Sequence, residues 1–220
     1  SMGGTTRPLT LEDGLTLRHI PGIRYVAPHV MGLAEVKAGE RTRQMMVYGT
    51  VHDDQFVLQW FPRIGVFLPE GDPELAPAVC VLGSRAASEL FPRSNPLGAK
   101  VRVGQSRFTV VGVMSSKGQM HGFDMDDMAF IPVRRAMKLF NLAQVSEIHL
   151  FVTSHSMIDR ATREARRALI DRHGGEEDST ITTNADMLKV VDQVFAVLST
   201  GVLVIAAISV LVGAIGILTI

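Results

Sequence analysis

The C-terminal part of the chain is an apolar run without a charged side chain, and it limits the possible architectures more than any other feature. From Gln193 to Ile220 there is no Asp, Glu, Lys, Arg or His. A helix rises about 1.5 Å per residue, so roughly 20 apolar residues cross the ~30 Å hydrocarbon core of a membrane. Buried helices of soluble proteins are usually shorter and carry some charge. We therefore expect a transmembrane helix here, with a buried core helix as the alternative.

The residues before this run predict how the helix begins. Asn184 is a suitable N-cap, and no helix-breaking residue separates Asp186 from the apolar run. The pattern predicts one long helix over 186–220, which leaves a soluble region as a stalk and enters the membrane. The run stops at Ile220 without the flanking basic residues that normally fix orientation. We expect a piece of a longer protein, in which residues 1–8 (beginning SMGG) are a tag remnant and linker.

The composition of the chain excludes several classes of protein. Twenty-two Lys and Arg residues balance 22 Asp and Glu residues, so there is no excess of positive charge for binding a nucleic acid. Cys80 is the only cysteine, so no intrachain disulfide can form. This fits a cytosolic or bacterial periplasmic protein and excludes a small disulfide-stapled secreted scaffold. The strand-like residues around Cys80 predict a buried, inert thiol.

Strand and helix patterns follow one another in mixed order before the apolar run. The predicted strands are Ile23 to Val36, Gln44 to Val51, Val79 to Leu82, Lys100 to Val103, Arg107 to Met114, Met128 to Pro132, Glu147 to Val152 and Ser179 to Thr183. The predicted helices are Leu9 to His19, Ser84 to Phe91, Arg134 to Asn141 and Met157 to His173. Because hairpins interrupt the alternation of strand and helix, the order favours an α+β fold. A stretch rich in Pro, Gly and acid at 69–78 indicates a junction between two subdomains, one inserted into the other.

Motifs of catalysis are missing from the sequence. There is no G-x-x-x-x-G-K-[ST] phosphate loop, no G-x-S-x-G elbow and no H-E-x-x-H pair. Ser84 is better interpreted as a helix N-cap than as a nucleophile. The run His52-Asp53-Asp54 is better interpreted as a solvated loop or helix cap than as a metal site, because adjacent strand residues point to opposite faces. We expect no enzyme activity and no bound cofactor in this chain.

One stretch, 114–128, is rich in methionine and allows three interpretations. Its methionines could fill gaps in a small core, or form an adaptable surface for a partner or apolar ligand, or bind a soft metal such as Cu(I). The spacing matches no established ligand motif, which favours the first interpretation. The candidate metal ligands are Met120, His121, Met125 and Met128. The candidates for a partner or substrate surface are Met120, Phe123, Met125, Trp60 and Phe61.

Several segments together resemble one family. LGAKVRVGQSRFTVVGVM (Leu97 to Met114) looks like the signature of the periplasmic core domain of MacB-type ABC transporter permeases, in the FtsX-like permease superfamily. VLGSRAASELF (Val81 to Phe91) resembles the element before it, and Ala129 to Phe140 resembles the element after it. The segment from Asp159 to Gly174 is similar to a late element of the family. Val212 to Ile217 is similar to the start of its second transmembrane helix.

The resemblance implies a fold with two periplasmic subdomains. It predicts a porter-like α+β subdomain with an inserted small α/β subdomain, followed by a long stalk and transmembrane helix. The corresponding parts are 1–8 (tag remnant and linker), 9–74 (porter-like subdomain, first part), 75–142 (inserted subdomain), 143–185 (porter-like subdomain, second part) and 186–220 (truncated stalk and transmembrane helix).

The resemblance also implies a function and partners. It predicts that the chain couples cytoplasmic ATP hydrolysis to periplasmic movement, for export or extraction of an antibiotic, peptide, lipid or lipoprotein. The implied partners are an ATP-binding domain or subunit that holds ATP and Mg²⁺, a second permease subunit, membrane lipid and, in some members, a membrane-fusion adaptor. Residues 1–185 would lie on the periplasmic side of the bacterial inner membrane. The alternative from the residues is a membrane-tethered receptor that binds a ligand or metal through loop 114–128.

Overall fold

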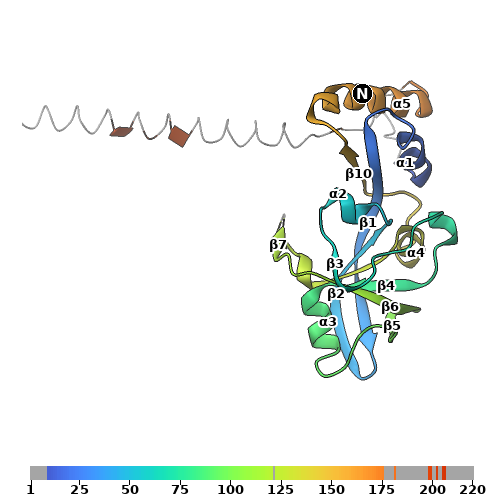
Figure 1. The fold of residues 1–220 in the computed structure, drawn as a ribbon, viewed down its shortest axis with the longest axis vertical. Coiled ribbons are helices and arrows are strands. Elements are labelled where there is room, and N and C mark those ends of the chain that lie inside the picture. The colour runs from blue at the N-terminus through green and yellow to red at the C-terminus, as the bar shows by residue number, and fades with distance from the viewer. Residues whose placement is uncertain are drawn as a thin grey trace, which may run out of the picture. The chain divides into compact units, whose positions relative to one another are not determined.

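The computed structural model describes residues 9–120 and 122–175, together with residues 181, 198, 199, 202, 205 and 206. Its helices are α1 (Leu11–Leu17), α2 (Asp54–Val57), α3 (Ser84–Leu90), α4 (Val133–Leu139) and α5 (Ile158–Arg172), with short 3-10 helices η1 (Pro73–Leu75), η2 (Met125–Asp127) and η3 (His155–Met157). Its strands are β1 (Ile23–Ala38), β2 (Arg41–Thr50), β3 (Pro62–Gly65), β4 (Val79–Leu82), β5 (Lys100–Val103), β6 (Ser106–Met114), β7 (Gln119–Met120), β8 (Phe123–Asp124), β9 (Met128–Pro132) and β10 (Glu147–Val152). The mixed, sheet-dominated order confirms the predicted α+β class (Figure 1).

Strand β1 is 16 residues long and pairs with two different partners. Its first half runs antiparallel to β10, from Ile23 opposite Val152 to His29 opposite Glu147. From Val30 onward its partner is β2, in the hairpin that the sequence predicts. Figure 1 shows α1, α5 and β10 around the first half of β1, and β2 and the other strands around the second half. One continuous strand therefore belongs to both parts of the fold.

The second part is a sheet built from segments far apart in the sequence. The order in the complete eight-stranded sheet is β10-β1-β2-β9-β4-β6-β3, where β10 belongs to the first part, and β5 pairs with both β1 and β6. Two of the pairs, β2 with β9 and β4 with β6, are parallel and therefore need crossover connections. Strands of the predicted insert, 75–142, thus pair directly with strands of the segment 9–74. The subdomain boundaries stay a prediction, and the observed change of strand partner lies at His29.

Two apolar clusters form the core of this part. The larger one joins β1, β2, β5 and β6 to α3 and α4, and it includes Cys80, Phe108 and Ile131. Cys80 is buried, as predicted, and burial raises the pKa of its thiol to about 12. The smaller cluster gathers Trp60 and Phe130 with the methionines that flank η2.

Most of the predicted stalk and membrane helix, 186–220, lies outside the described residues. Leu198, Ser199, Val202, Ile205 and Ala206 are helical there, and the five are exposed. Within the described part of the chain, no helix is both long enough and apolar enough to cross a membrane. The predicted strand from Ser179 to Thr183 also lies outside this part, apart from residue 181.

Gly49 marks the closest approach of α4 to β2. A Cβ atom at this position would lie 2.1 Å from the Cβ of Ala136 and 2.9 Å from Cγ2 of Val30. We expect Gly49→Ala to lower the free energy of unfolding by about 1–3 kcal/mol, because it overpacks the core. Urea denaturation of the purified variant measures this loss.

A second substitution tests whether this contact is the cause. Ala136→Gly removes the closest atom, so the double variant should be at least about 0.5 kcal/mol more stable than the sum of the two single losses predicts. Simple additivity would contradict the described packing of α4 on β2.

Candidate functional site

The two ends of the described domain meet at the side chain of Asp13. At the start of α1, the Thr10 hydroxyl accepts a bond from the Asp13 backbone N–H at 3.2 Å, and the Asp13 carboxylate accepts from the Thr10 N–H at 2.8 Å. This capping box satisfies two of the free N–H groups of the first turn. The same carboxylate accepts from Arg172 Nε at 2.6 Å and lies 3.3 Å from His173 Nε2, at the end of α5.

We call Thr10, Asp13, Arg172 and His173 the Asp13 clamp. The Asp13 side chain is only 2 % exposed. Burial alone would raise the pKa of Asp13, but the bonds from Arg172, Thr10 and His173 outweigh burial and lower the pKa below its ordinary value. The clamp therefore holds a buried carboxylate in its charged form. It joins residues 159 positions apart in the sequence, so sequence reasoning could find the capping pattern but not the partners from α5.

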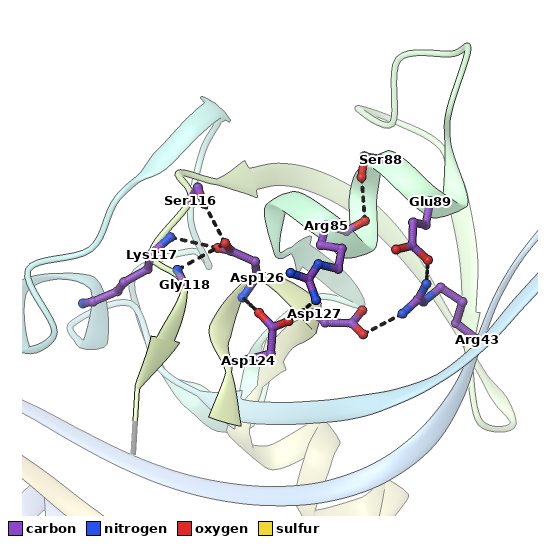
Figure 2. A network of polar contacts seen from close by, with 10 residues as sticks. All are labelled: Arg43, Arg85, Ser88, Glu89, Ser116, Lys117, Gly118, Asp124, Asp126 and Asp127. Atoms are coloured by element: carbon purple, nitrogen blue, oxygen red, sulfur yellow. Dashed lines mark hydrogen bonds and ion pairs between the residues drawn. The ribbon is translucent and has the colours of Figure 1, made fainter. Parts of the chain in front are cut away.

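A second polar network fixes the loop between β6 and β9 (Figure 2). The Asp126 carboxylate accepts from Ser116 Oγ at 2.6 Å and from the backbone N–H groups of Lys117 at 2.8 Å and Gly118 at 3.1 Å. Burial would raise the pKa of Asp126, but these bonds outweigh it and lower the pKa. The Asp126 N–H in turn donates to Asp124 Oδ1 at 3.1 Å.

Two arginines connect this loop to neighbouring elements. Arg85 of α3 pairs with Asp124. Arg43 of β2 pairs with Asp127 at 2.6 Å and also with Glu89 of α3. Figure 2 shows two separate sets of contacts. One joins Arg43 of β2 to Asp127 and Glu89, and the other joins Arg85 of α3 to Asp124 of the loop. The loop that carries the methionines is therefore held in one shape from both sides.

The same loop explains why one predicted cap is wrong. The N-cap of α3 is Gly83, not Ser84. The loop backbone packs on this residue so closely that a Cβ atom at Gly83 would lie 2.4 Å from the Asp126 carbonyl oxygen. The helix start is set by this tertiary contact and not by a local side-chain bond.

The methionines of 114–128 contribute largely to the core. Met114, Met125 and Met128 are buried in the cluster around Trp60, whose indole N–H donates to the Ser115 carbonyl at 2.7 Å. This is the arrangement that the gap-filling interpretation predicts. Of the candidate metal ligands, Met125 and Met128 thus lie in the core, whereas His121 and the Met120 side chain lie outside the described part. The soft-metal interpretation of this set stays a prediction.

The candidate surface residues divide into two groups. Trp60 and Met125 are buried. Phe61 and Phe123 are exposed, at 43 % and 41 %. Phe61 extends a row of aromatic rings, in which its centroid lies 5.8 Å from that of Phe56, and Phe56 stacks on Tyr25 at 4.7 Å. Phe61 and Phe123 remain the members of the predicted surface that a partner could contact.

The run His52-Asp53-Asp54 lies at the start of α2, where Asp53 is the N-cap residue, as the helix-cap interpretation predicts. Asp53 pairs with Arg18 at 2.9 Å, and His52 Nδ1 lies 2.7 Å from the Leu68 carbonyl oxygen. Asp54, however, is fully buried, so the solvated interpretation is wrong for this residue. It lies near His149 of β10, which approaches from a distant part of the chain. Sequence reasoning missed this cluster, although the spacing Glu147-x-His149 on a predicted strand was a usable signal.

Fold and sequence together define the class of this chain as a periplasmic core domain. The MacB-like periplasmic core domain family matches residues 1–168, and the chain belongs to that family. The chain is 31 % identical over 220 residues to the macrolide export ATP-binding/permease protein MacB of Nitrobacter winogradskyi, covering 99 % of this chain and 34 % of the relative. It is 29 % identical over 222 residues to the pyoverdine export ATP-binding/permease protein PvdT of Pseudomonas entomophila, covering 96 % and 33 %. The predicted family resemblance is confirmed.

Solved structures support the same fold. The periplasmic region of MacB from Actinobacillus actinomycetemcomitans superposes with a TM-score of 0.73 at 20 % identity, covering 86 % of this chain and 85 % of that one. The extracellular domain of the ABC-type transporter YknZ from Gram-positive bacteria gives a TM-score of 0.68 at 20 % identity, covering 80 % and 90 %.

The Asp13 clamp predicts a specific dependence of stability on pH. The pKa of Asp13 is lower in the folded than in the unfolded state, so its bonds stabilise the fold at neutral pH and are lost as the pH falls through the folded-state pKa. Asp13→Asn should lower the free energy of unfolding by about 2 kcal/mol at neutral pH. It should also weaken the fall in stability below about pH 5. Urea denaturation across this range measures both effects.

Glu12→Gln is the matched control, because Glu12 contacts the same arginine, Arg172, at 3.4 Å but is 82 % exposed. An exposed ion pair contributes little, so the expected loss is below about 0.5 kcal/mol. Equal losses in the free energy of unfolding for Glu12→Gln and Asp13→Asn would show that the buried carboxylate stabilises the fold no more than the exposed one.

Proposed function

We propose that this chain is the periplasmic part of an ABC transporter permease subunit, which couples cytoplasmic ATP hydrolysis to movement in the periplasm. The family match and the export relatives support this proposal. The chain spans about a third of the length of those relatives (34 % and 33 %), so the remaining parts of a transporter would lie outside it. The substrate would be an antibiotic, peptide, lipid or lipoprotein.

The observation that carries the proposal is the Asp13 clamp. In this family the periplasmic domain lies between two membrane helices, so the chain before α1 and the chain after α5 would both lead to the membrane. Arg172 and His173 bond to a buried carboxylate of α1, and charge-assisted bonds of this kind are strong and directional. A displacement of the chain after α5 would therefore move α1 as well.

The next step of the coupling path is β1. Helix α1 packs on this strand, where Gly14 lies against Pro28. Since β1 pairs with β10 in one half and with β2 in the other, it belongs to both parts of the fold. Movement applied at the clamp would thus reach the sheet that carries the exposed Phe61 and the loop near Phe123.

The proposed partners follow from this arrangement. A cytoplasmic ATP-binding domain or subunit would hold ATP and Mg²⁺, and a second permease subunit would complete a dimer in the inner membrane, with lipid around the membrane helices. A membrane-fusion adaptor or the substrate would contact the surface around Phe61, Phe123 and Met120. The alternative, a receptor that uses loop 114–128, has less support because Met125 and Met128 pack in the core.

The coupling proposal predicts separation of transport from ATP hydrolysis. In the full-length transporter, Asp13→Asn should lower substrate export several-fold while ATP hydrolysis by the partner continues, because force is lost between α5 and α1. Export and ATPase activity are measured on the same vesicles, with Glu12→Gln as the control. Wild-type export per ATP in Asp13→Asn would contradict the proposal.

The partner surface predicts a different pattern. Phe61→Ser and Phe123→Ser should reduce export or adaptor binding while the domain stays folded, since the two side chains are 43 % and 41 % exposed. Leu75→Ser, at another exposed apolar position on η1, serves as the control. If all three variants export like the wild type, the aromatic surface has no role in contact with a partner.

A further inference from the structure

A cluster of histidines and carboxylates lies where β1 changes its partner. His29 of β1 is directly opposite Glu147 of β10. His149 is two residues beyond Glu147, so Glu147 and His149 project from the same face of β10. Directly opposite residues of an antiparallel pair also share a face, which places His29 with them. Strand pairing alone therefore brings two imidazoles and one carboxylate together.

The distances in this cluster suit a small cation. His149 Nε2 lies 3.5 Å from Glu147 Oε2, and His29 Nε2 lies 3.9 Å from the same oxygen. One ligand atom from each of the three residues lies within 4.8 Å of the other two. Tetrahedral Zn²⁺ with ligands at about 2.1 Å needs ligand atoms about 3.4 Å apart. The Glu147 side chain is 70 % exposed, and a small rotation would close the set around an ion.

Asp54 provides a second, independent observation. Its carboxylate is fully buried, and neither oxygen has a hydrogen-bond partner in the described structure. Its Oδ1 lies 3.8 Å from His149 Nδ1, on the side of the ring away from Glu147. A carboxylate behind a metal-binding histidine fixes the ring with Nδ1–H toward itself and the Nε2 lone pair toward the metal. Asp54 is placed for this role.

The rings of the two histidines lie close together. His29 is buried and stacks on Tyr48, with ring centroids 4.8 Å apart, and its ring lies 4.3 Å from that of His149. Among the described residues, His29 Nδ1, His149 Nδ1 and both Asp54 oxygens have no partner within hydrogen-bond distance, and the nearest approach between Asp54 and His149 is 3.8 Å.

We propose that His29, Glu147 and His149 bind a divalent late transition metal of the Zn²⁺ class, with Asp54 as the residue that orients His149. Two imidazoles and one carboxylate prefer such an ion to Ca²⁺ or Mg²⁺, which take oxygen ligands. Three protein ligands leave a fourth position for water or an oxygen of a bound molecule. The ion would tie β1 to β10 at the joint between the two parts of the fold. The site is independent of the proposed transport function.

The test is a metal titration of the purified chain after treatment with a chelator. Co²⁺ serves as the optical probe, and Zn²⁺ and Ca²⁺ serve as competitors. We expect one equivalent of Co²⁺ to produce the visible d–d bands of a four- or five-coordinate ion. Zn²⁺ should remove these bands, and excess Ca²⁺ should not. A spectrum of hexaaqua Co²⁺ at all ratios would overturn the proposal.

Variants assign the ion to these residues. Glu147→Gln changes an exposed side chain, so the variant should fold, and it should weaken Zn²⁺ binding at least about 10-fold. His149→Gln should abolish the bands, and Asp54→Asn should weaken binding about 10- to 100-fold if it folds. The controls are His19→Gln and Glu35→Gln, at exposed or half-exposed positions outside the cluster. Wild-type affinity in both Glu147→Gln and His149→Gln would place the ion elsewhere and refute the site.

Discussion

The pairing of β1 with two different strands is the constraint on which the rest of the structure depends. Its first half pairs with β10, and its second half pairs with β2. Because β10 comes after all the other strands in the sequence, the first part of the fold is complete only when the chain has returned from the second part. The backbone hydrogen bonds of one strand therefore connect the two parts, and the larger apolar cluster also extends into the first part at Leu11 and Ala27. Such a strand resists bending between its halves, because bending would expose unpaired N–H and C=O groups. The polar residues gathered near the joint, His29 and Asp54 among them, lie where the partner changes.

Charged contacts fix further segments of the fold, in addition to the pairing of β1. The Asp13 clamp joins α1 to the end of α5, and the network around Asp126 fixes the loop between β6 and β9. In both, a buried carboxylate accepts several bonds that outweigh the cost of burial. Contacts of this kind fix one geometry more than they add stability. The proposed transmission of movement would require defined geometry at the clamp and at the loop near Phe123, where the two networks lie.

Local patterns were enough to predict most elements. Val79–Leu82, Lys100–Val103, Met128–Pro132 and Glu147–Val152 have the predicted bounds, because short β-branched runs between turn residues have few alternatives. What failed depended on distant residues. The N-cap of α3 is Gly83 and not the predicted Ser84, because the backbone of Asp126 packs against Gly83. Asp54 has the sequence surroundings of a solvated turn, yet it is buried and lies near His149 of β10, a distant part of the chain. The partners of Asp13 could not be predicted either, since Arg172 is 159 positions away.

The central claim is that the clamp transmits movement from the membrane side to the far sheet. The most direct measurement uses a spin label at Leu33, an exposed position on the second half of β1, in both subunits of the full-length transporter. The distance between the two labels is recorded with and without a non-hydrolysable ATP analogue. The account predicts a nucleotide-dependent change of distance in the wild type that is lost in Asp13→Asn. A distance that is the same with and without nucleotide would contradict it. So would a nucleotide-dependent change in Asp13→Asn equal to that in the wild type.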